Sequence, residues 1–366
     1  MRASLSRTGM LWSCDYPCLS PPDMKLLIIT NNPRNASFRQ RIELHLPAFR
    51  DSGLDCEVAR LPRGALARRR LFKQAAEFDG VLLHKKGLNL HDAFCLRRCA
   101  RRILYDFDDA MMYKARTPDR SGGSRLRAFR RTVRMADLVI AGNAYLAEHA
   151  RRYNAAVQIV PTGLDVAAYD PGTRPEPDGK TRLVWIGSRA TLRYLSDVGP
   201  ALEQIGSRFP NVVLRIICDT FFDLRNLPIE KRCWSRETEA PDLVSSDIAL
   251  APLPDDPFTR GKCGFKILQY AAGGLPVVAS PVGVNAEYVQ DGVTGFHANH
   301  ASDWVERIGQ LVKDSRLRER MGLAGRSAIQ RFDLPVVGQK LVRVVNESLR
   351  APESPNGDGP GAASHP

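Results

Sequence analysis

A short glycine loop precedes a helix-like stretch, and two lysines stand at this junction. The loop spans 261–264 with the sequence Gly-Lys-Cys-Gly, and Lys266 falls in the first turn of the amphipathic stretch 265–272. Glycine lets backbone amides approach an anion closely, and the first turn of a helix carries partial positive charge. This pattern predicts a phosphate site with a diphosphate as its natural ligand. The loop is not a Walker loop, because neither Ser nor Thr follows Lys262.

Two further glycine turns follow predicted strands in the same half of the chain. Their candidate ligand-binding residues are Gly187, Ser188 and Arg193 in the first turn, and Asn285 and Glu287 in the second. Each turn alone is more often an ordinary bend. Three loops at the carboxyl ends of three strands converge on one place, however, and together they predict a site for a nucleoside diphosphate.

Three carboxylates cluster at the end of one predicted strand, in the sequence Tyr-Asp-Phe-Asp-Asp of residues 105–109. Because like charges repel, Asp106, Asp108 and Asp109 require a cation or a hydroxyl donor between them. We expect Asp108 to orient or deprotonate a substrate hydroxyl group. Two other interpretations stay open: a metal site with Asp-x-Asp spacing, and a structural role as a helix cap or in ion pairs with nearby arginines.

Further charged residues follow neighbouring strands. Arg39 and Arg41 come after the first strand, where they are expected to face the diphosphate or an acidic substrate. A solvated helix face is the alternative for both. His84 ends another strand beside Lys85 and Lys86, and a lone histidine in this position favours a structural role.

Short apolar runs alternate with amphipathic stretches along the whole chain. Strands are predicted at 25–30, 78–85, 102–110, 182–188, 211–218, 247–253 and 275–281, and helices at 38–53, 90–102, 192–209 and 265–274. This alternation is typical of parallel sheets with crossover helices. The predicted fold class is α/β, with two doubly wound, Rossmann-like domains that face a cleft.

Composition divides the chain into segments. Residues 171–180 are dense in Pro and Gly, which predicts a linker. The predicted segments are a disordered or wrongly assigned N-terminal extension at 1–23, an N-terminal domain at 24–170, a C-terminal domain at 181–335, a helix crossing back toward the N-terminal domain at 336–350, and a disordered tail at 351–366.

The positive charge is unevenly distributed. The formal net charge is +13, and residues 24–165 hold 27 Lys and Arg against 14 Asp and Glu, whereas residues 166–366 hold 24 of each kind. A basic domain of this kind attracts an anionic membrane, a nucleic acid or an acidic substrate. A merely solvated surface is the alternative. Few aromatic residues stand among the arginines, which disfavours nucleic acid as a partner.

Composition also bears on the compartment. The eight cysteines show no paired or zinc-like spacing, which is typical of free thiols in a reducing cytosol. No apolar run reaches the length of about 18 residues that a membrane-spanning helix needs. We therefore expect a cytoplasmic protein that binds, at most, the inner face of the cell membrane.

Longer stretches resemble a known family. The sequence GKCGFKILQYAAGGLPVVASPVGVNAEYVQDGVTGF, at 261–296, resembles the C-terminal signature of family 4 glycosyltransferases of the GT-B fold. The segments WIGS with LRYL, DIALAPLPDD and RFDLPVVGQKLVRVV are similar to the same family. In the first half, RILYDFDDA, AGNAYLAEHA and IVPTGLD resemble one bacterial branch of it. The resemblance covers most of residues 24–350.

The resemblance implies transfer of a sugar from a nucleoside-diphosphate sugar to a hydroxyl group, usually with retention and without a metal. The C-terminal domain would hold the donor and the N-terminal domain the acceptor. The implied donor-binding residues are Gly187, Ser188, Arg193, Lys262, Cys263, Gly264, Gln269, Asn285 and Glu287. Those implied for catalysis are Asp108, Asp106 and Lys266, and those on the acceptor side are Arg39, Arg41 and Asp109.

The chain departs from the family at two glutamates that usually stand eight positions apart. Gly261 occupies the position of the first, which contacts the donor sugar, and Gln269 that of the second, which binds the ribose. A glutamine still hydrogen-bonds a ribose, more weakly than a carboxylate. The adjacent acids Asp255 and Asp256 are candidates for the missing contact to the sugar.

The expected function is therefore that of a glycosyltransferase whose acceptor is a glycan or is linked to a lipid. No cofactor is expected, because the nucleoside-diphosphate sugar is a substrate. The expected partners are this donor, the acceptor and an anionic membrane surface, without nucleic acid. Two alternatives stay open: a degenerate, non-catalytic protein that binds sugar nucleotides, and a nucleotide-sugar epimerase of similar fold.

Overall fold

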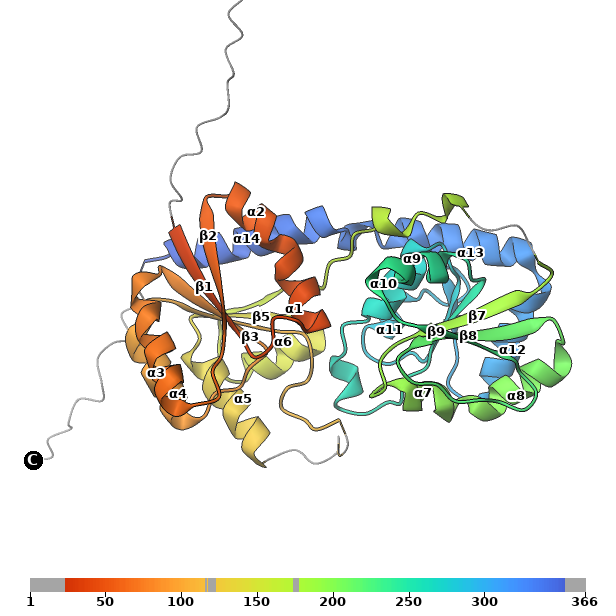
Figure 1. The fold of residues 1–366 in the computed structure, drawn as a ribbon, viewed down its shortest axis with the longest axis horizontal. Coiled ribbons are helices and arrows are strands. Elements are labelled where there is room, and N and C mark those ends of the chain that lie inside the picture. The colour runs from red at the N-terminus through yellow and green to blue at the C-terminus, as the bar shows by residue number, and fades with distance from the viewer. Residues whose placement is uncertain (1–23, 116, 118–122, 174–177, 353–366) are drawn as a thin grey trace, which may run out of the picture.

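The computed structural model describes residues 24–115, 117, 123–173 and 178–352 (Figure 1). The predictions for 1–23, for part of the linker at 174–177 and for the tail at 353–366 lie outside the described residues.

The N-terminal half forms a six-stranded parallel sheet in the order β2-β1-β3-β4-β5-β6. Its strands are β1 (Met24–Thr30), β2 (Leu54–Arg60), β3 (Gly80–His84), β4 (Ile103–Phe107), β5 (Leu138–Ala141) and β6 (Val157–Ile159). The helices of this half are α1 (Ala36–Arg41), α2 (Leu46–Asp51), α3 (Ala65–Gln74), α4 (Leu90–Cys99), α5 (Gly123–Met135) and α6 (Ala144–Arg151). Strands β3 and β4 are buried along their whole length, as expected where helices cover both faces of a sheet.

The C-terminal half repeats this architecture with the strand order β12-β11-β10-β7-β8-β9, again all parallel. Its strands are β7 (Thr181–Ile186), β8 (Val212–Cys218), β9 (Ile229–Cys233), β10 (Ile248–Ala251), β11 (Val277–Ala279) and β12 (Gly295–His297). Its helices are α7 (Leu192–Asp197), α8 (Gly199–Arg208), α9 (Arg236–Val244), α10 (Phe265–Ala272), α11 (Asn285–Tyr288), α12 (Ala301–Lys313), α13 (Ser315–Ala328) and α14 (Leu334–Arg350). The predicted fold class, two doubly wound parallel-sheet domains, is confirmed.

The strand orders place a switch point in each sheet. In the N-terminal sheet the order reverses between β1 and β3, and in the C-terminal sheet it reverses between β7 and β10. Loops on either side of a switch point leave the sheet in opposite directions and open a crevice at the carboxyl ends of the strands. The fold thus gives each half one crevice suited to a ligand.

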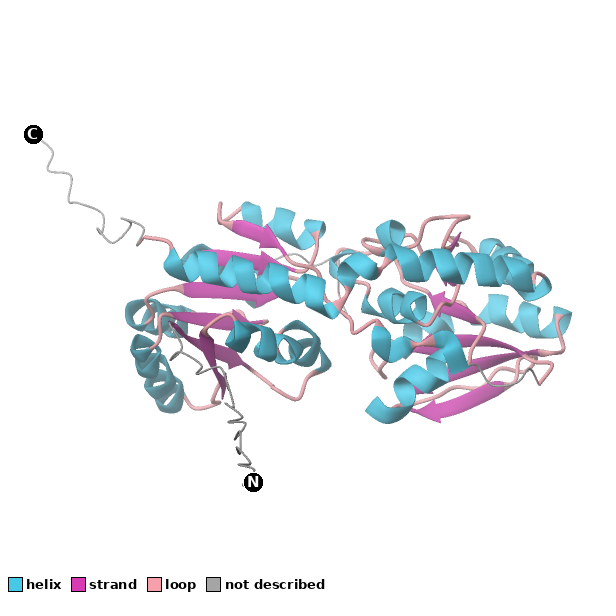
Figure 2. Cartoon of the chain, turned by 90° about the horizontal axis from the view of Figure 1, so that it is seen from above, coloured by secondary structure: helices cyan, strands magenta, loops and turns pink. Residues whose placement is uncertain are grey.

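The last helix packs on the first sheet. Helix α14 runs from the C-terminal half across to the N-terminal half (Figures 1 and 2). Its residues Val337, Leu341 and Val345 are buried in one cluster with Leu26 of β1 and Leu82 of β3. Burial of such side chains is worth about 1.5–3 kcal/mol each, so α14 ties the two halves together.

Two predicted helices are wrong in extent. The stretch 38–53 is not one helix, because α1 ends at Arg41, a 3₁₀ turn follows, and α2 starts anew with Pro47 in its first turn. Likewise 192–209 divides into α7 and α8, and Pro200 lies in the first turn of α8. Proline has no N–H to donate to the preceding turn, so it favours the start of a helix over its interior.

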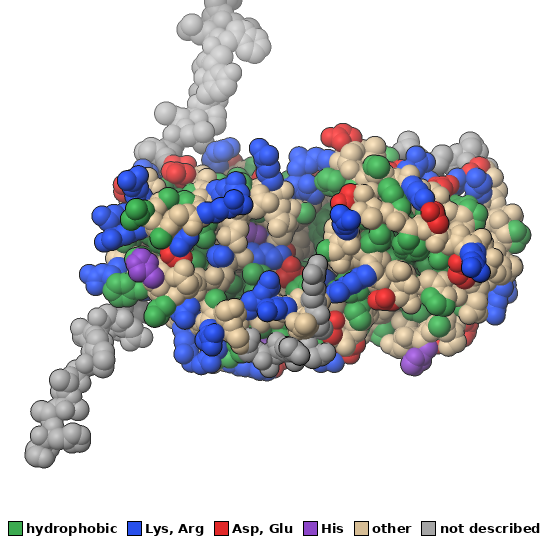
Figure 3. All heavy atoms as spheres, turned by 60° about the horizontal axis from the view of Figure 1, so that its bottom comes forward, with side chains coloured by type: hydrophobic (Ala, Val, Ile, Leu, Met, Phe, Trp, Pro, Cys, Tyr) green, Lys and Arg blue, Asp and Glu red, His purple; other side chains and the backbone are tan. Residues whose placement is uncertain are grey.

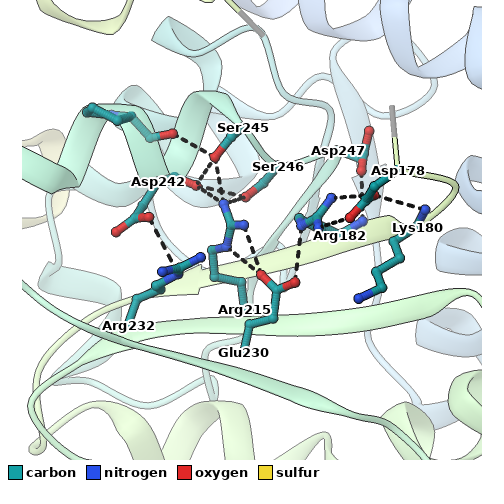
Figure 4. Close-up of polar contacts among 11 residues, drawn as sticks. Asp178, Lys180, Arg182, Arg215, Glu230, Arg232, Asp242, Ser245, Ser246 and Asp247 are labelled. Carbon is teal, nitrogen blue, oxygen red and sulfur yellow. Dashed lines mark hydrogen bonds and ion pairs between the residues drawn. The ribbon is translucent and has the colours of Figure 1, made fainter. Parts of the chain in front are cut away.

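A buried arginine on β8 joins the edge strand β9 to helix α9 (Figure 4). Arg215 on β8 is 4% exposed, and its guanidinium donates to the carboxylate of Glu230 on β9 at 3.0 and 2.8 Å. Its Nη1 atom donates to the backbone oxygen of Asp242 and to the hydroxyl of Ser245, both at 2.7 Å, at the end of α9. One side chain therefore satisfies polar groups of both β9 and α9.

Replacing this arginine should destabilise the C-terminal half. Arg215→Met is expected to lower the free energy of unfolding by about 2–3 kcal/mol, because buried acceptors lose a charged donor. Urea unfolding followed by tryptophan fluorescence measures this loss, since Trp185, Trp234 and Trp304 all lie in this half.

Arg232→Met is the matched control. Arg232 is half-exposed and lies 3.7 Å from the carboxylate of Asp242, so its loss should cost less than about 1 kcal/mol. Equal losses in the two variants would contradict a special role for Arg215.

Candidate active site

A cleft of about 320 Å³ lies between the two halves, where the switch-point loops of both sheets meet. Figure 3 shows the molecule hollowed between its two halves. The N-terminal wall includes Asn35, Ser37, Lys85, Asp108 and Asp109, and the C-terminal wall includes Trp185, Tyr194, Lys262, Cys263, Gly264, Lys266 and Asn285. Loops that follow β1, β3 and β4 thus face α10 and its preceding loop.

Two carboxylates and two lysines form a chain of charges across this cleft. Lys85 pairs through Nζ with Asp108 at 2.8 Å and with Asp109 at 2.5 Å. Asp109 also pairs with Nζ of Lys262 at 3.3 Å, which comes from the other half of the molecule. Lys85 has a φ of 50°, a left-handed conformation that costs energy outside glycine. This strained turn holds Nζ between the two acids.

The third carboxylate, Asp106, is fully buried behind the cleft. Its side chain forms an ion pair with Arg41 of α1 and lies 2.9 Å from Nδ1 of His84. The other ring nitrogen of His84 lies 3.4 Å from the hydroxyl of Ser37, which donates to Asp108 at 2.7 Å. A continuous polar path therefore links Asp106 to Asp108 through His84 and Ser37.

These contacts fix the charges of the acids. Burial raises the pKa of Asp108 and is the largest single effect, but Lys85, His84 and Arg41 together outweigh it and hold that pKa well below the usual range. Arg41 and His84 in the same way lower the pKa of Asp106 against the effect of its burial. Burial lowers the pKa of Lys85, and its pairing with both acids more than offsets this, so the net shift is upward. Asp106 and Asp108 are therefore charged, and each lies beside a cation that neutralises it.

The glycine loop docks directly on the N-terminal half. Asn143, the cap of α6, donates through Nδ2 to the backbone oxygens of Gly261 at 3.2 Å and Lys262 at 3.0 Å. The thiol of Cys263 donates to the backbone oxygen of Asp108 at 3.2 Å. A Cβ on Gly261 would lie 2.7 Å from Cβ of Ala110. This position therefore has no room for a side chain, which accounts for the absence of the glutamate expected there.

Lys266 lies at the start of α10, over the ring of Trp185 at 4.0 Å from its centroid. Burial, followed by the neighbouring charge of Lys262, lowers the pKa of Lys266 to about 7. Gly187 is close by, since a Cβ there would lie 2.7 Å from Nζ of Lys266. Gly264, with a φ of 64°, begins the helix in the left-handed conformation that glycine adopts without cost. Both Gly264 and Lys266 line the cleft.

Gln269 does not line the cleft. It is 3% exposed, and its Nε2 donates to Glu239 at 2.8 Å and to the hydroxyl of Tyr169 at 3.1 Å. Glu239 also accepts from the hydroxyl of Tyr169 and from the indole of Trp234. The carboxylate of Glu239 on α9 thus lies beside Gln269, although the two residues are 30 positions apart. The spacing of residues around the glycine loop did not predict this contact.

The remaining predicted residues lie outside the cleft wall. Ser188 is exposed and bonded within its own turn, and Arg193 donates to the backbone oxygen of Ala115 across the two halves at 2.8 Å. Glu287 is exposed, and Arg39 lies over the ring of Trp234 at 5.6 Å. Arg41 is buried against Asp106.

The acids proposed to replace the missing glutamate have other partners. Asp255 pairs with Arg260, and Asp256 accepts from the backbone amides of Phe258 and Thr259. Within the described residues, no group of three or more His, Cys, Asp or Glu side chains is placed to hold a metal ion.

Comparison with known proteins finds similarity in the segment that forms part of this site. Residues 234–314 match the family of group 1 glycosyl transferases. The D-inositol 3-phosphate glycosyltransferase of Arthrobacter sp. (strain FB24) is 28% identical over 216 residues, which are 52% of this chain and 50% of that protein. The phosphatidyl-myo-inositol mannosyltransferase of Mycobacterium tuberculosis (strain H37Rv) is 27% identical over 315 residues, 78% of this chain and 79% of that protein. The chain spans about half the length of the D-inositol 3-phosphate glycosyltransferases that it matches.

Solved structures share the fold. Anabaena Alr3699/HepE, in complex with UDP and glucose, superposes with a TM-score of 0.66 at 16% identity, over 88% of this chain and all of that one. WaaG, a glycosyltransferase involved in lipopolysaccharide biosynthesis, superposes with a TM-score of 0.63 at 13% identity, over 87% of this chain and 99% of that one. The architecture is the GT-B fold of these glycosyltransferases. The family match and the relatives together support a glycosyltransferase enzyme.

The contact between Gly142 and the glycine loop gives a test of how closely the two halves dock. A Cβ on Gly142 would lie 2.4 Å from Sγ of Cys263, so Gly142→Ala should push the loop away from the N-terminal half. We expect a larger radius of gyration in small-angle X-ray scattering and a lower melting temperature.

The double variant Gly142→Ala/Cys263→Ala removes the sulfur that the new methyl group meets. It should recover the compact radius of gyration, with Cys263→Ala alone as the reference for lost thiol contacts. A compact Gly142→Ala single variant would contradict the tight docking of this loop.

Proposed function

We propose that the protein transfers a sugar from a nucleoside-diphosphate sugar to a hydroxyl group of a glycan or a lipid-linked acceptor. The observation that carries this proposal is the cleft itself, in which Lys262, Lys266 and the first turn of α10 face Asp108 and Ser37 of the other half. One wall offers positive charge for a leaving diphosphate, and the other offers groups that orient a hydroxyl. The family match of residues 234–314 covers the first wall.

The donor diphosphate would lie against Lys262, Lys266 and the free amides at the start of α10. Departure of the nucleoside diphosphate builds negative charge on the phosphate nearest the sugar. Positive groups that meet this charge stabilise the transition state more than the ground state. We propose that these lysines and amides make the reaction independent of a metal. The UDP in the structure of Anabaena HepE supports a nucleoside diphosphate as the ligand here.

The lowered pKa of Asp108 bears on the proton of the acceptor. A carboxylate neutralised by Lys85 is a weak base. We therefore assign Asp108 and Ser37 to orienting the acceptor hydroxyl, and the proton passes to the leaving phosphate. Attack from the same side as the departing phosphate gives retention. Asp106 acts as a positioning residue, since it touches Arg41 and His84 rather than the cleft.

The excess of positive charge in residues 24–165 bears on the location of the protein in the cell. We propose that this face meets an anionic membrane from the cytoplasmic side, which would bring a lipid-linked acceptor to the cleft. Among the described residues, no helix is both long and apolar enough to cross a membrane.

Titration calorimetry with UDP, GDP and their sugar conjugates tests the donor site. One nucleotide is expected to bind in the micromolar range, and Lys266→Ala should weaken it by about tenfold or more because a charge-assisted contact is lost. Transfer or donor hydrolysis by the wild type separates an enzyme from a non-catalytic binding protein. Absence of nucleotide binding would overturn the proposal.

The pKa of Lys266 predicts a pH dependence of nucleotide binding. A bound diphosphate favours the ammonium form, so its pKa rises from about 7 on binding. The nucleotide should therefore bind most tightly below pH 7. Between pH 7 and the higher pKa that Lys266 has in the complex, its affinity should fall by up to about tenfold for each pH unit.

Calorimetry between about pH 7.5 and pH 9, in buffers of different ionisation enthalpy, measures the fall in affinity and the proton taken up. Lys266→Met has no group that titrates there and should bind weakly without this dependence. An equal slope in wild type and Lys266→Met would assign the proton to another group.

A further inference from the structure

A second and larger groove opens on the N-terminal half, with a volume of about 1510 Å³. We call it the basic groove. On one side it is lined by Arg60 at the end of β2, by Arg63 in the loop before α3 and by Arg68 in the first turn of α3. The acid on its wall, Asp92 of α4, is paired with Arg68 at 2.9 Å. The negative charge in the groove is therefore already neutralised by one of its own arginines.

The other side of the basic groove adds further cations. Lys86 follows β3, and Arg127 and Arg131 project from α5. Arg131 is fixed by a bond to the backbone oxygen of Leu88 at 3.0 Å. Within the described residues, Arg63, Lys86 and Arg127 have no ion pair. Figure 3 shows Lys and Arg side chains gathered over this half of the molecule. The groove thus presents uncompensated positive charge from both sides.

The basic groove adjoins the candidate active site. Lys85 lines the cleft and Lys86, the next residue, lines the groove. In the same way, Asn31 lines the groove and Asn35 lines the cleft, just after β1. Both pairs follow strands at the N-terminal switch point. A molecule held in the groove would therefore reach the cleft over the strained turn at Lys85.

The rim of the groove is apolar as well as basic. Leu90 lines the groove and is 70% exposed, and Phe94, one helical turn further on α4, is 60% exposed. Residues four apart share a face of a helix. Leu66, between the groove residues Arg63 and Arg68, is 77% exposed. Large apolar side chains this exposed, next to unpaired cations, suit a ligand that joins an anionic group to a hydrocarbon chain.

We propose that the basic groove binds the phosphate groups of an amphiphilic acceptor, while its hydrocarbon chain lies on Leu90 and Phe94 and its hydroxyl group reaches Asp108. Arginine recognises phosphate through paired N–H donors, which favours phosphate over a diffuse negative surface. The role of this ligand as the acceptor rests on the proposed function, whereas its binding in the groove does not. The binding test below therefore needs no transfer reaction.

Farnesyl diphosphate, a soluble molecule with two phosphates and a hydrocarbon chain, is a suitable probe. Titration calorimetry should show that the full chain binds it, and that the triple variant Arg63→Ala/Lys86→Ala/Arg127→Ala binds about tenfold more weakly or worse, as expected for the loss of three charge contacts. The triple variant should still bind the nucleotide of the donor site. Lys266→Ala should show the opposite pattern.

Arg316→Ala/Arg320→Ala/Arg343→Ala is the matched control. It removes the same charge from exposed positions on α13 and α14 that lie outside both cavities, and it should bind the probe as the wild type does. Equal weakening in control and triple variant would overturn the proposal, because net charge alone would explain it.

Two further probes separate the sources of phosphate. Inorganic tripolyphosphate should bind more weakly than farnesyl diphosphate, and equal affinity would overturn the role of the apolar rim. Vesicles of phosphatidylglycerol should bind no more tightly than the soluble probe. Binding to vesicles without any binding of farnesyl diphosphate would assign the groove to the membrane surface and overturn the proposal. If the wild type binds farnesyl diphosphate but no nucleotide, the result would contradict the proposed function and leave the proposed ligand of the basic groove standing.

Discussion

The charge balance at the end of β4 is the constraint on which the arrangement of both halves depends. Three carboxylates, those of Asp106, Asp108 and Asp109, lie within four residues at the end of this strand, and each is paired with a cation. Asp106, fully buried, takes Arg41 and so fixes the position of α1. Asp108 takes Lys85 from the turn after β3, and Asp109 takes Lys262 from the C-terminal half. An unpaired charge at the buried Asp106 would cost several kcal/mol, and the pairs of Asp108 and Asp109 add contacts to two further segments.

The docking of the glycine loop explains a departure from the family pattern. A glutamate at Gly261 cannot coexist with a loop whose backbone oxygens accept from Asn143, because Ala110 occupies the space of its side chain. The chain has a close contact between its halves at the position where the family resemblance implies a carboxylate. Gly142 and Cys263 meet in the same interface. A glycine at position 261 is therefore explained by packing between the halves.

Periodic patterns in the sequence predicted what depends on local order. The alternation of apolar and amphipathic runs predicted two parallel sheets, and the glycine loop predicted helix α10 and the lysines at its start. Lys262 and Lys266 do line the cleft together with Asp108 and Asn285. These features follow from burial periodicity and from loops at strand ends, which neighbouring residues specify.

Sequence patterns did not predict the contacts between segments that are far apart in the chain. From the sequence alone, Arg41 is compatible with an exposed helix surface. The fold buries it against Asp106, which lies 65 positions later. The pairing of Gln269 with Glu239 and Tyr169 depends on how α9 crosses α10, and no spacing rule covers that crossing. The single helices predicted at 38–53 and 192–209 failed for a local reason, since Pro47 and Pro200 start new helices there.

The two cavities share one turn, and this links charge on the surface to charge in the cleft. Lys85 is held inward by Asp108 and Asp109, whereas Lys86 has no ion pair within the described residues and lines the basic groove. An anion in the groove would meet Lys86 without competing for Lys85, which is already neutralised. An anion in the cleft would instead compete with Asp109 for Lys262. In the proposed arrangement, a ligand on the donor side would therefore loosen an ion pair between the halves, while phosphate in the groove would leave it intact. The charged groups of the two ligands would bind through different lysines, although their reacting ends would meet at Asp108.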